Sequence, residues 1–237
     1  MTAAPARGRL LVFEGAEGVG KSTQVARLVA RLRAAGGAGE SYREPGATPL
    51  GERVRALVLD PAAEVRPAAE ALLFMAARAQ LVALVRERLA AGVTVVLDRF
   101  FLSTYAYQVA GRGLPAESVR AANALATGGL VPDLTVLLTC DPAVAAGRVA
   151  ARGALDRMEQ AGDAFHARVA AAFAAAGDPA WLAAHPEVGP VVVVDATGAP
   201  ADVESRLAAL LAARWPESFP ETRDETFAAP RESNEGR

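Results

Sequence analysis

The chain has little of what marks secreted, membrane-spanning or nucleic-acid-binding proteins. Its 237 residues include a single cysteine, Cys140, so no disulfide can form within the chain and a reducing cytoplasm is expected. The formal net charge is −2, which excludes a global positive field that recruits nucleic acid or an anionic membrane. We find no cleavable leader in MTAAPARGRL and no apolar run near the roughly 18 residues that span a bilayer. We therefore expect a cytoplasmic protein without nucleic-acid or membrane partners, in which any anion-binding charge is local.

Short apolar runs alternate with amphipathic helical stretches along most of the chain. The runs at 9–15, 39–44, 93–100, 134–140 and 191–197 are apolar on both faces, which is typical of strands in a buried parallel sheet. Helical stretches start near residues 21, 49, 67, 116 and 142. This alternation predicts one doubly wound α/β domain over residues 9–215, after a short extension at 1–8. The charged, proline-containing segment 216–237 is predicted to be a mostly disordered tail.

Residues 13–23, FEGAEGVGKST, contain the G-x-x-x-x-G-K-[ST] pattern between a predicted strand and a predicted helix. Glycines let backbone N–H groups turn toward phosphate oxygens, and the helix N-terminus adds partial positive charge. Lys21 is then expected to reach the β- and γ-phosphates and Ser22 to bind Mg²⁺. The alternative is a tight turn with a solvated lysine. The predicted ATP-binding loop comprises Gly15, Ala16, Glu17, Gly18, Val19, Gly20, Lys21, Ser22 and Thr23.

Two further strand ends carry charged residues, and the N-K-x-D tetrapeptide of GTP switches is absent. The third strand ends in Asp98-Arg99, at the edge where α/β sheets bind ligands. Asp98 is placed to hold magnesium, and Arg99 adds charge for a second anion. Arg43 ends the second strand before a Pro-Gly loop. The alternatives are a surface ion pair at 98–99 and a loop-capping role for Arg43.

A basic residue interrupts the apolar stripe of the helix predicted from residue 67. Phe74, Arg78, Leu81, Val85 and Leu89 recur at helical spacing, with Arg78 in the middle. An unpaired buried arginine is unfavourable, so this pattern favours a helix that lines a base pocket, with Phe74 stacking and Arg78 donating hydrogen bonds. The alternative is an arginine that extends to solvent.

Residues 141–160 predict a helix with an Asp141 N-cap and Pro142 in its first position. Arg148, Arg152 and Arg157 follow, with Gly153 after Arg152. An arginine-bearing segment with a glycine hinge is typical of a lid over ATP, here about residues 147–160. A lid arginine stabilises charge on the transferring phosphoryl group. The alternative is a solvated helix face.

Over residues 9 to about 212, these motifs together resemble the bacterial thymidylate kinases. The resemblance rests on FEGAEGVGKST, REPGATPLGERVR, LFMAARAQ, DRFFLSTYAYQ and ARGALDRMEQ, in this order. It implies a three-layer α/β/α fold of the P-loop NTPase type with a five-stranded parallel sheet, usually as a homodimer. It also implies Mg²⁺-dependent transfer of the γ-phosphoryl group of ATP to dTMP.

The resemblance also implies roles for individual residues. Those assigned to dTMP are Phe74 and Arg78 for thymine, Arg43 and Arg99 for the phosphate, Thr104 and Gln108 along the base, Tyr107 against the 2′ position and Glu17 at the sugar. Lys21, Asp98, Arg99 and Arg152 are the implied catalytic residues, Ser22 and Asp98 the implied metal ligands, and Arg148 an implied ATP contact. Gly18 stands where some family members carry a loop arginine, so the chain resembles the type with its arginine in the lid.

Two alternative functions remain from the sequence. One is a kinase for another nucleoside monophosphate or a deoxynucleoside, because uridylate differs from thymidylate only by a methyl and a hydroxyl group. The other is a nucleotide-sensing module with an inactive kinase fold.

Overall fold

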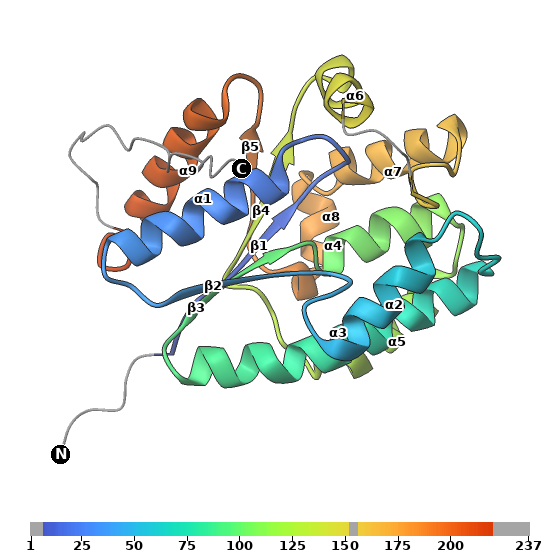
Figure 1. Ribbon diagram of the computed structural model, residues 1–237, viewed down its shortest axis with the longest axis horizontal. Coiled ribbons are helices and arrows are strands. Elements are labelled where there is room, and N and C mark those ends of the chain that lie inside the picture. Colours follow the sequence, from blue (N-terminus) through green and yellow to red (C-terminus); the bar gives the residue numbers. More distant parts are fainter. Residues whose placement is uncertain (1–6, 152–155, 220–237) are drawn as a thin grey trace, which may run out of the picture.

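The computed structural model describes residues 7–151 and 156–219, and a sheet of five parallel strands forms its centre (Figure 1). The strands are β1 (Leu10–Glu14), β2 (Gly39–Arg43), β3 (Thr94–Asp98), β4 (Leu134–Thr139) and β5 (Val191–Asp195). Their order in the sheet is β2-β3-β1-β4-β5, and each neighbouring pair is parallel. The predicted α/β fold with a five-stranded parallel sheet is confirmed, and every strand lies within the apolar run that predicted it.

Helices cover both faces of this sheet (Figure 1). On one face lie α1 (Lys21–Ala34) and α9 (Pro200–Arg214); the other is covered by α3 (Pro67–Ala90), with α2 (Pro49–Leu59), α5 (Ala116–Thr127) and α7 (Asp163–Ala175). The side chains of β1 alternate between the two cores: Leu11 and Phe13 pack with α1 and α9, whereas Leu10 and Val12 pack on the opposite face. Both faces of the sheet are therefore buried, which explains why its strands are apolar throughout.

Five short elements complete the described chain. They are α4 (Phe101–Thr104), the π-helix η1 (Tyr105–Gly111), α6 (Pro142–Ala150), α8 (Pro179–Ala184) and the 3₁₀ helix η2 (Pro186–Val188). The predicted cap of α6 is present, because the Asp141 carboxylate accepts a hydrogen bond of 2.7 Å from the Ala143 N–H. Phe219 is buried against the core of α1 and α9, so packed structure continues at least to this residue. Most of the predicted tail, residues 220–237, lies outside the described residues.

The longest described helix, α3, carries the predicted apolar stripe, and Leu81, Val85 and Leu89 are buried. By length and composition alone α3 could cross a membrane, with a mean hydropathy of 1.6 over its most apolar 18-residue window. Any such window includes Arg78, which is why no unbroken apolar run appears in the sequence. In the structure α3 packs against α2, α5 and β3, as a helix of the protein core does.

Candidate active site

A cavity of about 790 Å³ lies at the carboxyl ends of the strands. It brings together most of the residues that the sequence predicts for the site. These lining residues are Glu17, Gly18, Val19, Gly20, Lys21, Ser22, Thr23, Arg43, Phe74, Arg78, Asp98, Arg99, Thr104, Tyr107, Gln108 and Arg148. Gly15 and Ala16 belong to the same loop but do not line the cavity, and Arg152 lies outside the described residues. The roles given to these residues in catalysis and binding stay predictions.

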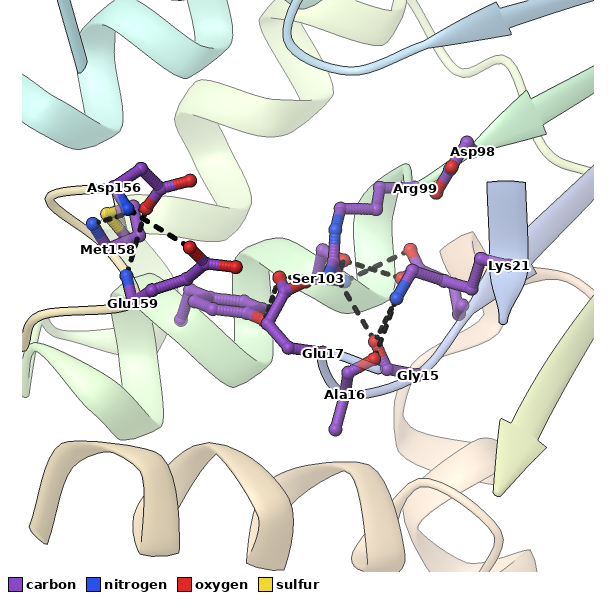
Figure 2. Close-up of polar contacts among 12 residues, drawn as sticks. Gly15, Ala16, Glu17, Lys21, Asp98, Arg99, Ser103, Asp156, Met158 and Glu159 are labelled. Carbon is purple, nitrogen blue, oxygen red and sulfur yellow. Dashed lines mark hydrogen bonds and ion pairs between the residues drawn. The ribbon is translucent and has the colours of Figure 1, made fainter. Parts of the chain in front are cut away.

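The phosphate loop joins β1 to α1 as the motif predicts. Gly18 and Gly20 have φ values of 75° and 93°, which other residues rarely adopt, and α1 starts at Lys21. The Lys21 ammonium group donates to the carbonyls of Gly15 (3.1 Å) and Ala16 (2.7 Å), as Figure 2 shows. Burial foremost, and then the positive charge of Arg99, lower the pKa of Lys21 to about 8. The loop can therefore bind an anion. A bound negative charge would stabilise the charged form of Lys21, which burial and Arg99 disfavour.

The two predicted metal ligands meet at one edge of this loop. The Ser22 hydroxyl donates a hydrogen bond of 2.5 Å to Asp98 Oδ2 across the gap between α1 and β3. Within the described ranges, no cluster of three or more His, Cys, Asp or Glu residues could hold a metal through protein ligands alone. One hydroxyl and one carboxylate suit Mg²⁺, which keeps several waters and is completed by substrate phosphates. The donor set at Ser22 and Asp98 therefore fits the implied ion.

Arg99 lines the cavity with its guanidinium group already held by protein acceptors (Figure 2). It forms an ion pair with Glu17 and donates to Gly15 O (3.1 Å) and Ser103 Oγ (3.0 Å). Burial works against the charge, but nearby carboxylates, that of Glu17 foremost, raise the pKa of Arg99 above its usual range. Its backbone has a φ of 72°, in the left-handed region that non-glycine residues seldom occupy. Such a conformation persists where the surroundings fix it, as at functional sites.

A buried carboxylate that we did not single out in the sequence supports the segment after Arg99. Glu14, at the end of β1, is fully buried and accepts hydrogen bonds from Phe100 N (2.8 Å), Ser103 N (3.1 Å) and Ser103 Oγ (2.6 Å). It thereby ties the start of α4 to the strand beside it. Its position at the end of a predicted strand was a usable signal.

A second group of cations lies beside Arg99, at the end of β2. Arg43 is the register partner of Asp98 in the neighbouring strand and forms an exposed ion pair of 3.2 Å with Glu52. Arg55 of α2 also lines the cavity, and its guanidinium group donates to Pro45 O at 3.1 Å. Burial foremost, followed by the charge of Arg43, lowers the pKa of Arg55. The sequence predicts Arg43 at this site but does not predict Arg55.

Phe74 and Arg78 line the cavity from α3. Arg78 is 3% exposed, so the alternative in which it extends to solvent is excluded. Its Nε donates to Glu44 (2.8 Å), Nη1 to Thr104 and Asn123 (both 2.8 Å), and Nη2 to Phe100 O (2.8 Å). Nη2 also forms an ion pair of 2.6 Å with Glu44. Four hydrogen bonds and an ion pair thus hold the guanidinium group within the protein, and the predicted bond from Arg78 to a base carbonyl stays a prediction.

Tyr107 and Gln108 reach the cavity from η1. Tyr107 packs against Phe165 and Phe173, and its hydroxyl group donates to Glu17 at 3.1 Å. Burial foremost raises the pKa of Tyr107, so this hydroxyl stays protonated as a donor. The Gln108 side chain donates to Glu70.

The predicted lid segment is described on both sides of residues 152–155. Arg148 donates long hydrogen bonds to Gly18 O (3.4 Å), Ala196 O (3.4 Å) and Gly198 O (3.3 Å), and so bridges the phosphate loop and the turn after β5. Arg157 turns away and contacts Val58 O and Glu70, both at 2.7 Å. Three residues without a predicted role, Asp156, Met158 and Glu159, line the cavity opposite Glu17 and Arg99 (Figure 2).

A phosphate loop and a group of further arginines that line one cavity are the features of a P-loop kinase acting on small phosphorylated substrates. Residues 13–188 match the family model described as Thymidylate kinase. The chain belongs to the thymidylate kinase family.

Curated relatives agree along most of the chain. The thymidylate kinase of Deinococcus radiodurans is 49% identical over 209 residues, which cover 88% of this chain and 98% of the relative. Those of Synechococcus sp. (strain JA-2-3B'a(2-13)) and Pseudomonas fluorescens (strain Pf-5) are both 46% identical, over 87% and 86% of this chain and 95% of each relative.

Proposed function

We propose that this protein transfers the γ-phosphoryl group of ATP to dTMP, giving ADP and dTDP, with Mg²⁺. The observation that carries the proposal is one cavity that is lined both by a phosphate loop and by three arginines from outside this loop, Arg43, Arg55 and Arg99. A nucleotide-binding switch needs only the phosphate loop, whereas a kinase with a phosphorylated acceptor also needs cations that hold the acceptor phosphate. The reactive side chains are present, which argues against an inactive sensing module.

ATP occupies the phosphate loop in this proposal. Backbone N–H groups from Gly15 to Thr23 hold the β- and γ-phosphates, and Lys21 turns from its carbonyl partners to the phosphate oxygens. Arg148, beside Ala196 and Gly198, lies where the adenosine end extends over the turn after β5. Ser22 and Asp98 would hold Mg²⁺, which would supply positive charge against the phosphates of ATP.

The acceptor occupies the opposite half. Arg43, Arg55 and Arg99 hold its phosphate, Glu17 and Tyr107 face its sugar, and Phe74 stacks on its base. Thr104, Gln108 and Arg78 border the base edge. Because the Tyr107 ring packs against Phe165 and Phe173, it has little freedom to move away from a ribose 2′-hydroxyl group, which favours a deoxyribose acceptor.

The reaction itself needs positioning more than proton transfer. An oxygen of the acceptor phosphate attacks the γ-phosphorus in line, and the bond from the γ-phosphorus to the β,γ-bridging oxygen breaks with its electron pair leaving on ADP. Because the attacking phosphate is already anionic, no general base is required. Lys21 and Arg99 contribute by lowering the cost of the charge that develops on the transferring group, and Arg152 is the predicted third contributor.

A panel of acceptors tests the substrate assignment. ADP release with Mg-ATP is measured for dTMP, dUMP, dCMP, dAMP, dGMP and thymidine. We expect dTMP to have the highest kcat/KM. A preference for a purine nucleotide would favour the alternative of another nucleoside monophosphate kinase. A preference for thymidine would favour a deoxynucleoside kinase. No ADP release with any of the acceptors would revive the sensing module.

We also propose that the enzyme works in the cytoplasm as a homodimer, through the outer face of the layer formed by α2, α3 and α5. Leu57, Leu72 and Leu125 are 47%, 63% and 87% exposed on these three helices. Exposed apolar residues mark a surface for a partner where they form one patch, which is the arrangement that this proposal assumes for the three leucines. Sedimentation velocity is expected to give a dimer that Leu72→Glu weakens, and a monomeric wild type would contradict this part.

A further inference from the structure

Behind the base end of the cavity lies a carboxylate that the proposed function does not use. Glu70, in the first turn of α3, is fully buried. Arg112 donates to its Oε1 (3.1 Å) and Oε2 (3.0 Å), and Arg157 donates to Oε2 at 2.7 Å. A buried carboxylate is unfavourable without such partners. The two arginines therefore explain how Glu70 is tolerated, but its place beside the pocket needs another reason.

The third partner of Glu70 is the pocket residue Gln108. Its Nε2 lies 3.1 Å from Glu70 Oε1, and both residues are buried. A carboxylate in two ion pairs accepts hydrogen bonds and donates none, so the Gln108 amide must turn its NH₂ group toward Glu70. Its carbonyl oxygen is then on the other arm of the amide, and in the described part of the chain this oxygen has no hydrogen-bond donor. Glu70 thus makes Gln108 an acceptor for whatever fills the pocket.

A second lining residue has the opposite polarity. Thr104, four residues before Gln108 in the continuous helical segment α4–η1, accepts a hydrogen bond of 2.8 Å from Arg78 Nη1. Since Arg78 can only donate, the hydroxyl hydrogen of Thr104 remains available for the pocket. Thr104 therefore offers a donor and Gln108 an acceptor on the same side of the cavity.

This pattern matches one kind of pyrimidine edge. Thymine and uracil present the O4 acceptor next to the N3–H donor, whereas cytosine presents an amino donor next to an N3 acceptor. We propose that Glu70 is a positioning residue of the acceptor site, which fixes the Gln108 amide so that the pocket selects bases with a hydrogen on N3. The inference rests on the proposed function, because it assumes that the acceptor base lies against Phe74.

The proposal predicts that the substitution Glu70→Gln changes the selectivity between dTMP and dCMP as well as the activity. Two arginine N–H groups point at the Oε2 position, against one at Oε1, so the carbonyl of the introduced glutamine should occupy the Oε2 position. The NH₂ group of this new side chain then faces Gln108, whose amide must turn over and direct its own NH₂ into the pocket. That polarity suits the N3 acceptor of cytosine.

The experiment measures kcat/KM for dTMP and for dCMP in the wild type, E70Q and the matched control E87Q. Glu87 is an exposed carboxylate on the same helix without a side-chain partner among the described residues. We expect E70Q to lower the ratio of dTMP to dCMP by at least about tenfold, and E87Q to leave it unchanged. An equal loss with both substrates would indicate a purely structural role and overturn the proposal.

The substitution Gln108→Met tests whether Glu70 influences the base selectivity through Gln108. If Glu70 acts through Gln108, adding E70Q to Q108M leaves the dTMP to dCMP ratio of Q108M unchanged. A further fall of the ratio in the double variant would mean that Glu70 acts elsewhere.

A measurement on the wild type covers the case in which E70Q fails to fold. dTMP methylated at N3 lacks the hydrogen that the Gln108 carbonyl accepts, and we expect its kcat/KM to be at least about 100-fold below that of dTMP. Comparable turnover of the two would overturn the inference. Turnover of dTMP itself tests the proposed function alone, so the two can fail separately.

Discussion

Gly18 of the phosphate loop lies directly against Ala145 of α6, so closely that a Cβ on Gly18 would be 2.3 Å from the Ala145 carbonyl oxygen. Arg148, one turn further along α6, donates to the Gly18 carbonyl. The loop and the helix that leads into the predicted lid are therefore packed backbone to backbone. An arginine cannot occupy position 18 in this arrangement, which gives a physical reason for the resemblance to family members whose arginine lies in the lid.

The first prediction concerns this contact. Gly18→Ala should displace α6 from the loop, because the added methyl group has no space and φ is 75°. We expect the KM for ATP to rise about tenfold or more and the free energy of unfolding to fall by about 1–3 kcal/mol. Steady-state kinetics and urea unfolding measure the two effects.

Gly36→Ala is the matched control for that experiment. Gly36 has a similar φ of 78°, but a Cβ there meets no atom within 4 Å. The Gly36→Ala variant should lose about 1 kcal/mol in the free energy of unfolding, because alanine is disfavoured at this φ, and its KM for ATP should not change. The same kinetic change in both variants would contradict a specific role for the contact between Gly18 and Ala145.

Lys21 leads to the second prediction, on stability against pH. Its pKa in the folded protein is about 8, against a usual 10.5, so below pH 8 the folded state holds a buried charge that the unfolded chain keeps in water. As pH rises from 8 to 10.5, the folded protein releases this proton first and the cost disappears. Lys21→Met should therefore raise the free energy of unfolding of the unliganded enzyme by about 1–3 kcal/mol at pH 7 and by less at pH 10.

Lys21→Met should also lose nearly all turnover, because the ammonium charge that destabilises the folded protein is the charge that binds the phosphates of ATP. Thermal unfolding at the two pH values, without nucleotide, is the measurement. A destabilised Lys21→Met protein at pH 7 would show that the hydrogen bonds to Gly15 and Ala16 outweigh the burial of the charge.

The sequence predicts those parts of the site whose signals are local. The phosphate loop is contiguous, and Asp98 and Arg99 follow a strand made recognisable by its apolar residues. The helices α7 and α9 were not predicted, since both are rich in alanine, which blurs the difference between the apolar and polar faces.

Partners that come together only in the fold could not be predicted. Arg78 is recognisable as an unusual residue, but Thr104 and Asn123, which hold it, lie 26 and 45 residues further along the chain. Glu70 looks like an ordinary first-turn carboxylate, and its contact with Arg157 spans 87 residues. Arg55 is similar: it stands among other charged residues of α2, and only the packing of that helix shows which of them reaches the cavity.

Arg55 carries the third prediction. Arg55→Met should raise the KM for dTMP about tenfold or more while kcat changes less, because the residue lines the cavity beside Arg43 and Pro45, where the proposal puts the acceptor phosphate. Arg53→Met is the control, since Arg53 is an exposed residue of the same helix. A change confined to the KM for ATP would move Arg55 to the donor site and contradict the proposed arrangement.

The fourth prediction concerns Asp98 and the metal. Asp98→Asn keeps the size of the side chain and can still accept the hydrogen bond from Ser22, but it removes the negative charge that favours Mg²⁺. We expect the Mg²⁺ concentration for half-maximal activity to rise about 10- to 100-fold, with a smaller change in the KM for dTMP.

Titration of activity with MgCl₂ at a fixed ATP concentration measures this shift. Asp163→Asn, at the exposed start of α7, is the control for a general change in surface charge and should leave the titration unchanged. If Asp98→Asn lowered kcat without moving the Mg²⁺ titration, the carboxylate would act on Arg99 and Lys21, whose pKa values it helps to raise, instead of on the ion. In that case a lower pH optimum of the variant would accompany the loss, because Lys21 would then release its proton at a lower pH.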